Sequence, residues 1–257
     1  MRHNRFIGAF DLSGEQTQIT DADTVHQIAR VLRLGVGDTV VLGDRKGFEA
    51  NATIAVVGKD SVEVTLGEKR KNENEPLRRV TLYLAILKRE NFEYAAMKAT
   101  EVGVAALVPV ITARTVKTGL NTARIGKIMK EAAEQSGRGI VPELSDALSF
   151  EKALAHAKKN DANFFFHTAH AGAGEEKIST APDLVPEKNL PASREDARVG
   201  IFIGPEGGWS NDEVVAARNA GCALASLGRL TLRAETAAVV ATYLTTHPPH
   251  PKARPWA

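Results

Sequence analysis

The fold of this chain is decided by the stretch Val199-Gly200-Ile201-Phe202-Ile203-Gly204-Pro205-Glu206-Gly207-Gly208-Trp209-Ser210. An apolar run stops at a turn made of three glycines, a proline and a glutamate, and a helix-forming segment follows. This pattern indicates a buried strand that ends in a tight turn and leads into a helix. Because glycine has no side chain, a ligand can approach the main chain of such a turn closely.

A second segment of the same form lies nearby, from residue 227 to residue 237, with the sequence Leu-Gly-Arg-Leu-Thr-Leu-Arg-Ala-Glu-Thr-Ala. It opens into an alanine-rich helical stretch. Any one glycine is most simply explained as a tight turn, but glycines at two strand ends favour a ligand gripped by main-chain groups. A phosphate cradle is the rival, yet neither turn carries the Lys-Ser/Thr pair that a Walker loop needs.

Around these turns, apolar strands alternate with amphipathic helices. The strands are expected at residues 80–86, 105–110, 162–166, 200–203 and 223–227, and the helices at 92–102, 123–137, 150–158, 212–220 and 235–245. Residues 170–196 lack periodicity and are expected to form a surface excursion. The alternation predicts the α/β class, with a parallel sheet covered by helices on both faces.

The N-terminal part of the chain has a different rhythm. Short β-rich runs at residues 39–42, 48–54 and 61–66 are separated by glycines at hairpin intervals, which indicates a small barrel or sandwich with one helix at 23–34. The polar stretch 68–76 has no apolar periodicity and is expected to be a linker. Two domains follow from this: 1–72 and 76–247.

Composition narrows the class of protein. An apolar fraction of 43%, a charged fraction of 25% and one cysteine are those of a globular protein without a disulfide framework. Cys222 is expected to be a buried small hydrophobe, and no cluster suggests a metal. The longest apolar run is too short to span a bilayer, so the predicted location is the cytoplasm, with no membrane partner.

The net charge of +2 is unevenly distributed. Residues 76–140 hold 11 lysines and arginines against 5 acidic residues. Such a block is either a surface that faces phosphates or a solvated helix face, and charge alone does not decide between them.

The two turns together resemble the cofactor loops of the SPOUT methyltransferases, and more closely the branch that methylates N3 of a uridine in small-subunit ribosomal RNA. The resemblance extends along most of the chain. It includes His26 and Arg33 in the N-terminal module, the segment Lys98-Ala99-Thr100-Glu101-Val102-Gly103, and the segment Glu134-Gln135-Ser136-Gly137-Arg138. It is weakest in residues 145–198. Val102 and Thr231 depart mildly from the family pattern.

This resemblance implies a PUA-like β-barrel at residues 1–72, followed by a SPOUT domain whose C-terminal loops form a trefoil knot. It also implies S-adenosylmethionine as cofactor, 16S ribosomal RNA or the small ribosomal subunit as partner, and a homodimer whose active site is completed by both subunits. Knotting is an exception to ordinary topology and rests on the resemblance alone.

The expected site residues combine the two turns with the resemblance. The cofactor-binding residues are expected to be His167, Ile203, Gly204, Glu206, Gly207, Gly208, Leu227, Gly228, Leu230 and Leu232. Glu206 either lies near the sulfonium of the cofactor or caps the following helix. The residues expected to contact RNA are Arg5, His26, Arg33, Lys88 and Arg114.

Methylation at N3 of uridine requires loss of a proton from an imide, and a guanidinium can stabilise the negative charge that develops on O2 and O4. Arg233 and Arg138 are the candidates for that role, and Glu235 or Glu101 for the base. Arg233 and Glu235 equally suit a plain helix start, and Arg138 a helix C-terminus. Two other functions remain open: a SPOUT ribose 2′-O methyltransferase, and a non-catalytic RNA-binding assembly factor.

Overall fold

The structure, a computed structural model, describes residues 4–116, 119–167, 179–180 and 197–247. By its contacts the chain divides into two compact units, Met1–Glu75 with Lys130–Val141, and Pro76–Met129 with Pro142–Ala257. The first unit therefore includes a segment that lies more than fifty residues beyond the N-terminal module. Nothing in the local sequence marks that segment as part of the module, because its contacts are with residues far away in the chain.

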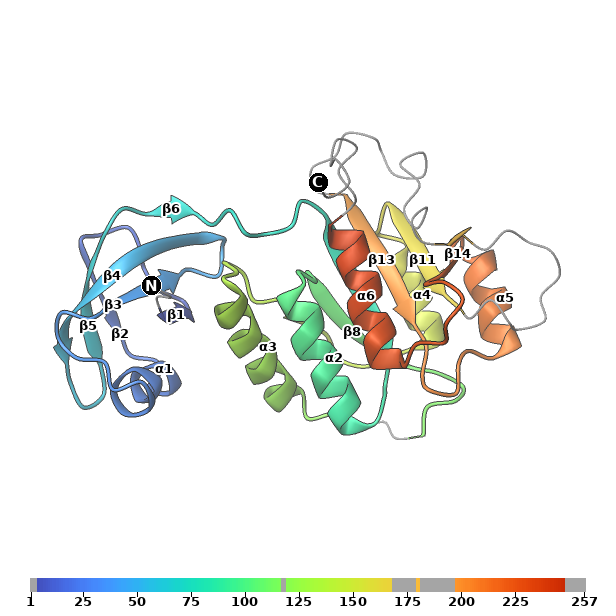
Figure 1. The fold of residues 1–257 in the computed structure, drawn as a ribbon, viewed down its shortest axis with the longest axis horizontal. Coiled ribbons are helices and arrows are strands. Elements are labelled where there is room, and N and C mark those ends of the chain that lie inside the picture. The colour runs from blue at the N-terminus through green and yellow to red at the C-terminus, as the bar shows by residue number, and fades with distance from the viewer. Residues whose placement is uncertain (1–3, 117–118, 168–178, 181–196, 248–257) are drawn as a thin grey trace. The chain divides into compact units, whose positions relative to one another are not determined.

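The first unit is built on a six-stranded sheet with the order β1-β3-β4-β5-β2, and β6 pairs with β4 (Figure 1). The strands are β1 (Asn4–Ile7), β2 (Gln16–Ile19), β3 (Thr39–Gly43), β4 (Phe48–Val57), β5 (Val62–Leu66) and β6 (Arg70–Lys71). All pairs are antiparallel except β1 with β3. The predicted helix is shorter than expected, with α1 (Ala22–His26) continuing as one π-helical turn, Gln27–Val31.

The predicted linker was wrong in its first half. Residues 70–71 form β6, and Asn72 is buried. The Glu49 carboxylate on β4 accepts hydrogen bonds from Arg70 Nη2 at 2.9 Å and from Asn72 Nδ2 at 2.6 Å. A polar stretch without periodicity looks like a linker, but here a buried carboxylate supplies partners for its polar side chains.

The second unit is built on an eight-stranded sheet in which every recorded pair is parallel, which confirms the predicted fold class. Its order is β10-β8-β7-β13-β11-β14-β12, and β9 pairs with β8. The strands are β7 (Arg79–Ala85), β8 (Ala106–Ile111), β9 (Glu143–Leu144), β10 (Leu148–Ser149), β11 (Ala162–Phe166), β12 (Ser179–Thr180), β13 (Arg198–Ile203) and β14 (Ala223–Ser226).

Helices cover both faces of this sheet, as predicted. They are α2 (Arg89–Glu101), α4 (Phe150–Ala157), α5 (Asn211–Asn219) and α6 (Ala234–Thr246), together with the first part of α3 (Thr122–Ser136), whose residues from Lys130 onward belong to the first unit. Along β7, Leu82 and Leu84 join one apolar core with residues of α2 and α6, whereas Tyr83 joins the other with residues of α4 and α5. This alternation follows from the two-residue period of a strand.

Two further expectations concerned the segment 170–196 and segments able to span a membrane. The expected excursion at 170–196 lies outside the described residues, apart from the short β12. Within the part of the chain that the structure describes, no helix is long and apolar enough to cross a membrane.

Candidate functional site

A cavity of about 590 Å³ lies at the carboxyl ends of neighbouring strands in the second unit. In the sheet, β7, β13, β11 and β14 are consecutive, and residues that follow each of them line the cavity. Ligands of open parallel sheets bind at this edge, because the connecting loops there are free of the strand ladder. The volume falls in the range of roughly 300–1,000 Å³ that is typical of small-molecule sites.

The loop after β13 forms one wall. Gly208 N donates to the Pro205 carbonyl at 2.8 Å, and Gly208 has a φ of +70°, a conformation that favours glycine. The ring of Trp209 packs so closely under Gly204 that a Cβ there would lie 3.0 Å from it. Trp209 Nε1 also donates to the Phe166 carbonyl at 3.0 Å, which ties this loop to the end of β11.

The loop after β14 forms the opposite wall. Gly228 has a φ of +109°, and the Ser226 hydroxyl donates to its carbonyl at 3.1 Å. Leu227 and Leu232 are partly buried, whereas Leu230 is 81% exposed although it lines the cavity. The loop therefore offers main-chain groups and leucine side chains to a ligand.

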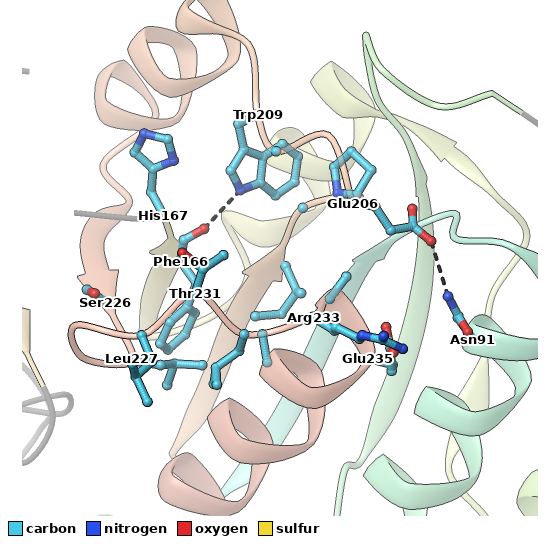
Figure 2. A pocket seen from close by; sticks show the side chains of 18 of the residues that line it. Asn91, Phe166, His167, Glu206, Trp209, Ser226, Leu227, Thr231, Arg233 and Glu235 are labelled. Carbon is cyan, nitrogen blue, oxygen red and sulfur yellow. Dashed lines mark hydrogen bonds between the residues drawn. The ribbon is translucent and has the colours of Figure 1, made fainter. Parts of the chain in front are cut away.

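The side chains of Glu206, Arg233 and Glu235 lie on one side of the cavity, with that of Asn91 (Figure 2). Asn91 Nδ2 donates to Glu206 Oε1 at 3.3 Å. Arg233 is the N-cap of α6 and is exposed, and its side chain makes no capping hydrogen bond. Glu235, in the first turn of α6, is 8% exposed, and its Oε2 atom is buried without a hydrogen-bond partner among the residues that the structure describes. A buried carboxylate oxygen without a partner is costly, so this oxygen is suited to a donor on a ligand.

His167 lies on the other side of the cavity in Figure 2, with Phe166 and Leu227. Burial lowers the pKa of its imidazole from the ordinary value, and the charge of Arg218 lowers it further. The neutral ring is therefore favoured, which suits a wall that contacts an uncharged aromatic group.

The structure brings together all of the expected cofactor-binding residues except Gly207, whose carbonyl instead accepts a hydrogen bond from Arg114 Nη1. Glu206 does not cap α5, because Ser210 and Glu213 form its capping box. Several residues that line the cavity were not predicted from the sequence: Asn91, Phe166, Pro205, Trp209, Ser226, Arg229, Thr231, Ala234 and Ala237. Phe166 and Trp209 adjoin predicted residues and could have been found from that position, whereas Asn91 carries no such signal.

The remaining expected residues have different surroundings. Lys88, Arg233 and Glu235 line the cavity, whereas Glu101 pairs with Lys98 on α2. Arg138 is only 3% exposed, and its Nη2 lies 2.8 Å from Glu75 Oε2.

In the first unit, Arg5 pairs with the buried Glu49. Burial pushes the pKa of Glu49 up, but hydrogen bonds from Arg5 and Asn72, together with the charges of Arg5 and Arg70, outweigh it, so that the pKa lies below its ordinary value. His26 and Arg33 are both exposed.

Much of the basic block at 76–140 is engaged in ion pairs. Glu93 accepts hydrogen bonds from both Arg89 and Arg124, and Lys98 pairs with Glu101 on the same helix. These contacts favour a solvated helix face for that part of the block, because exposed pairs of this kind are ordinary surface features. Within the described ranges there is no group of three or more histidine, cysteine or acidic side chains that could hold a metal ion.

Comparison with known proteins agrees with this geometry. The family model described as RNA methyltransferase domain matches residues 73–246, and the one described as RNA methyltransferase PUA domain matches residues 19–67. The chain is 31% identical over 245 residues to ribosomal RNA small subunit methyltransferase E of Rickettsia conorii, with 94% of each chain covered. It is 32% identical to the protein of that name from Bacillus subtilis, covering 90% of this chain and 87% of the relative.

Solved structures agree. A putative methyltransferase from Legionella pneumophila, in complex with S-adenosylmethionine, has a TM-score of 0.81 at 26% identity, with 95% of this chain and 97% of that one covered. A ribosomal RNA small subunit methyltransferase E from Neisseria gonorrhoeae, bound to S-adenosylmethionine, has a TM-score of 0.78 at 27% identity, with 94% and 95% covered. The chain belongs to the ribosomal RNA small subunit methyltransferase E family of RNA methyltransferases.

Proposed function

We propose that this protein transfers a methyl group from S-adenosylmethionine to N3 of a uridine in 16S ribosomal RNA. The observation that carries the proposal is a single cavity that joins two glycine-containing turns to a side lined by Arg233 and Glu235. Family membership supports the methyl transfer and the class of RNA. The cofactor agrees with the two solved relatives that hold it.

The cavity suits the two ends of S-adenosylmethionine. The adenosine would lie against Phe166, Leu227 and Leu232, where main-chain groups of the two loops are available for hydrogen bonds. The carboxylate of Glu206, which also lines the cavity, would favour the cationic sulfonium. When bound, S-adenosylmethionine supplies an activated methyl group.

Two side chains at the start of α6 would then act on the base. N3 of uracil carries a proton between two carbonyls, and Glu235 Oε2, which has no hydrogen-bond partner among the described residues, would accept a hydrogen bond and then that proton. The exposed guanidinium of Arg233 would stabilise the negative charge on O2 or O4. Because N3 lies on the Watson–Crick edge, the uridine must be unpaired or splayed out of its stack.

RNA would be held outside the cavity as well. In the first unit His26 and Arg33 are exposed, and we propose that they contact the RNA. Arg5 is engaged with Glu49, so any RNA contact that it makes would use the remainder of its guanidinium. Lys88, exposed at the N-cap of α2 and lining the cavity, would contact the phosphate or sugar of the target nucleotide. We propose the domain limits 1–72 and 76–247 and a cytoplasmic location on the same family grounds.

We further propose that the protein acts as a homodimer with knotted C-terminal loops, in which the segment that holds Arg138 completes the partner's site. Mixing Arg138→Ala protomers with Arg233→Ala protomers would then restore one intact site in each mixed dimer. Methylation by the mixture at a rate well above that of either variant alone supports shared sites. A monomer that is fully active at assay concentrations would overturn this arrangement.

The function itself is tested by mapping modified uridines in 16S ribosomal RNA by mass spectrometry, in cells with and without this protein. The proposal expects one uridine to lose a methyl group on the base when the protein is absent, and complementation with Arg233→Ala to leave it unmethylated. Loss of a ribose methyl group would indicate the 2′-O reaction instead. An unchanged methylation pattern would favour an assembly factor.

A further inference from the structure

The loop that carries Gly207 and Gly208 is held from outside the cavity by a neighbouring turn. We propose that Arg114 and Glu213 clamp this loop in its cofactor-binding conformation, so that Arg114 is a positioning residue for S-adenosylmethionine rather than solely a contact for RNA. The inference rests on the proposed function, because it assigns the outer support of the same cavity.

Arg114 covers the outer side of the loop. Its Nη1 donates a hydrogen bond to the Gly207 carbonyl. A Cβ on Gly207 would lie 3.5 Å from Arg114 Cδ, and one on Gly208 would lie 3.9 Å from Nη1, which are ordinary contact distances. Gly208 lines the cavity whereas neither Gly207 nor Arg114 does. The peptide between the two glycines therefore lies between the cavity and the Arg114 side chain.

The turn that presents Arg114 is itself well ordered by hydrogen bonds. Thr115 N donates to the Thr112 carbonyl at 3.1 Å, and Thr112 N donates to Thr115 Oγ1 at 2.9 Å. The two threonine hydroxyls lie 2.9 Å apart. This turn follows β8, the neighbour of β7 in the sheet, so it reaches the same edge as the cavity.

A buried carboxylate joins the turn to the other end of the loop. Glu213 is 6% exposed, and its two oxygens accept from different segments. Oε2 accepts from Ser210 N at 2.8 Å, within the capping box of α5, and Oε1 accepts from Ala113 N at 2.8 Å. Residues 113–114 therefore contact the loop at two points. Arg114 donates to the Gly207 carbonyl, and Glu213 accepts from both Ala113 N and Ser210 N.

The contacts of Arg114 and Glu213 should affect cofactor affinity because the loop contains two adjacent glycines, Gly207 and Gly208. Glycine loses more conformational freedom on ordering than any other residue, so an unsupported Gly207-Gly208 peptide would have to be ordered when the cofactor binds. A charge-assisted hydrogen bond from a guanidinium to the carbonyl removes part of that cost in advance. Without it, cofactor affinity should fall although no atom in contact with the cofactor has changed.

The test measures S-adenosylmethionine binding by calorimetry to Arg114→Ala, Arg114→Lys and Glu213→Gln in the full-length protein. Arg114→Ala should raise the Kd for S-adenosylmethionine by on the order of tenfold, the effect of losing one charge-assisted hydrogen bond. Arg114→Lys keeps the charge and one donor and should recover part of the affinity. Glu213→Gln replaces one acceptor oxygen by a donor group and should change the affinity in the same direction. Arg124→Ala, which removes an exposed arginine paired with Glu93, is the matched control and should not change it.

The readouts separate the possible outcomes. If wild-type protein binds no S-adenosylmethionine, the proposed function fails. If wild type binds and Arg114→Ala binds equally well, the clamp is overturned, and a raised KM for RNA with unchanged cofactor Kd would assign Arg114 to RNA alone. A higher KM for S-adenosylmethionine at unchanged kcat supports the clamp, because a general loss of structure would lower kcat and the melting temperature as well.

Discussion

Replacing Glu75 by alanine should destabilise the first unit by an amount that the contacts of its carboxylate allow us to estimate. This carboxylate accepts hydrogen bonds from Arg138 Nε at 3.3 Å and Nη2 at 2.8 Å. It also accepts from Gly139 N at 3.0 Å and Ile140 N at 3.1 Å. The substitution therefore removes the ionic partner of a buried guanidinium and the acceptor of two main-chain donors.

Removal of one partner of a buried ion pair costs about 3–5 kcal/mol when the other charge is left buried without compensation. Arg138 has further interactions in the folded chain, so its charge would remain partly compensated. The side chain of Arg138 is 4% exposed, but that of Glu75 is 21% exposed, so water can reach part of the space that the carboxylate leaves. The lower end of that range, about 3 kcal/mol, is therefore expected. Glu131→Ala, which removes an exposed carboxylate from α3, the helix that ends two residues before Arg138, should change stability by less than about 0.5 kcal/mol.

Urea denaturation followed by circular dichroism measures the loss of stability, and hydrogen exchange at the amides of Gly139 and Ile140 shows where it occurs. A change below about 1 kcal/mol for Glu75→Ala would refute the reasoning, because the other interactions of Arg138, or water, would then satisfy its guanidinium. The double variant Glu75→Leu with Arg138→Met should recover the part of the stability that is lost through the ion pair, since an apolar pair of similar volume can replace it, but not the part that is lost at Gly139 N and Ile140 N. Its methylation activity then tells whether Arg138 has a role in the reaction beyond this contact.

Three other predictions concern the cavity. S-adenosylmethionine at 100 times its Kd should add about 2.7 kcal/mol to the free energy of unfolding. In a thermal melt, Gly208→Val should abolish this stabilisation by the ligand. The control Gly221→Ala, at another glycine with positive φ, should keep it. Glu235→Gln should lower kcat by roughly 10²-fold or more without changing the Kd for S-adenosylmethionine, as expected for loss of a general base. An unchanged rate of methyl transfer in single-turnover assays would exclude Glu235 as the base. Because burial lowers the pKa of His167 below 6.5, the stability linked to its neutral form is fully present above pH 6.5 and is lost as the pH falls through the lowered pKa. His167→Gln should therefore flatten the pH dependence of the melting temperature in that range. Identical pH profiles for the variant and the wild type would contradict this reasoning.

The sequence was a good guide to the second unit because its elements are long and periodic. The strand at 162–166 was predicted with its observed limits, and α5 and α6 within one residue at each end. Apolar runs in strands that are buried on both faces, and glycines at their ends, are signals that each local segment carries by itself. Short elements such as β9 and β10 were missed, because two residues carry no period.

The candidate site was predictable where it is made of consecutive residues in the two glycine turns. The sequence alone determined that these turns follow buried strands and that Arg233 and Glu235 stand at the start of a helix. Only the tertiary structure decided that β13, β11 and β14 are neighbours, which brings both turns, His167 and Asn91 to one cavity. Strand order depends on pairing between distant segments, which no local pattern encodes.

The partners of arginine side chains also depend on contacts between residues that are distant in the chain. Arg138 carries the same local signal whether it faces a ligand or a partly buried carboxylate, and its contact with Glu75 joins residues 63 positions apart. Arg114, expected to contact RNA, donates to a glycine carbonyl 93 positions away. A long charged side chain can reach many partners, and the partner that it contacts depends on which acceptors the folded chain places within its reach.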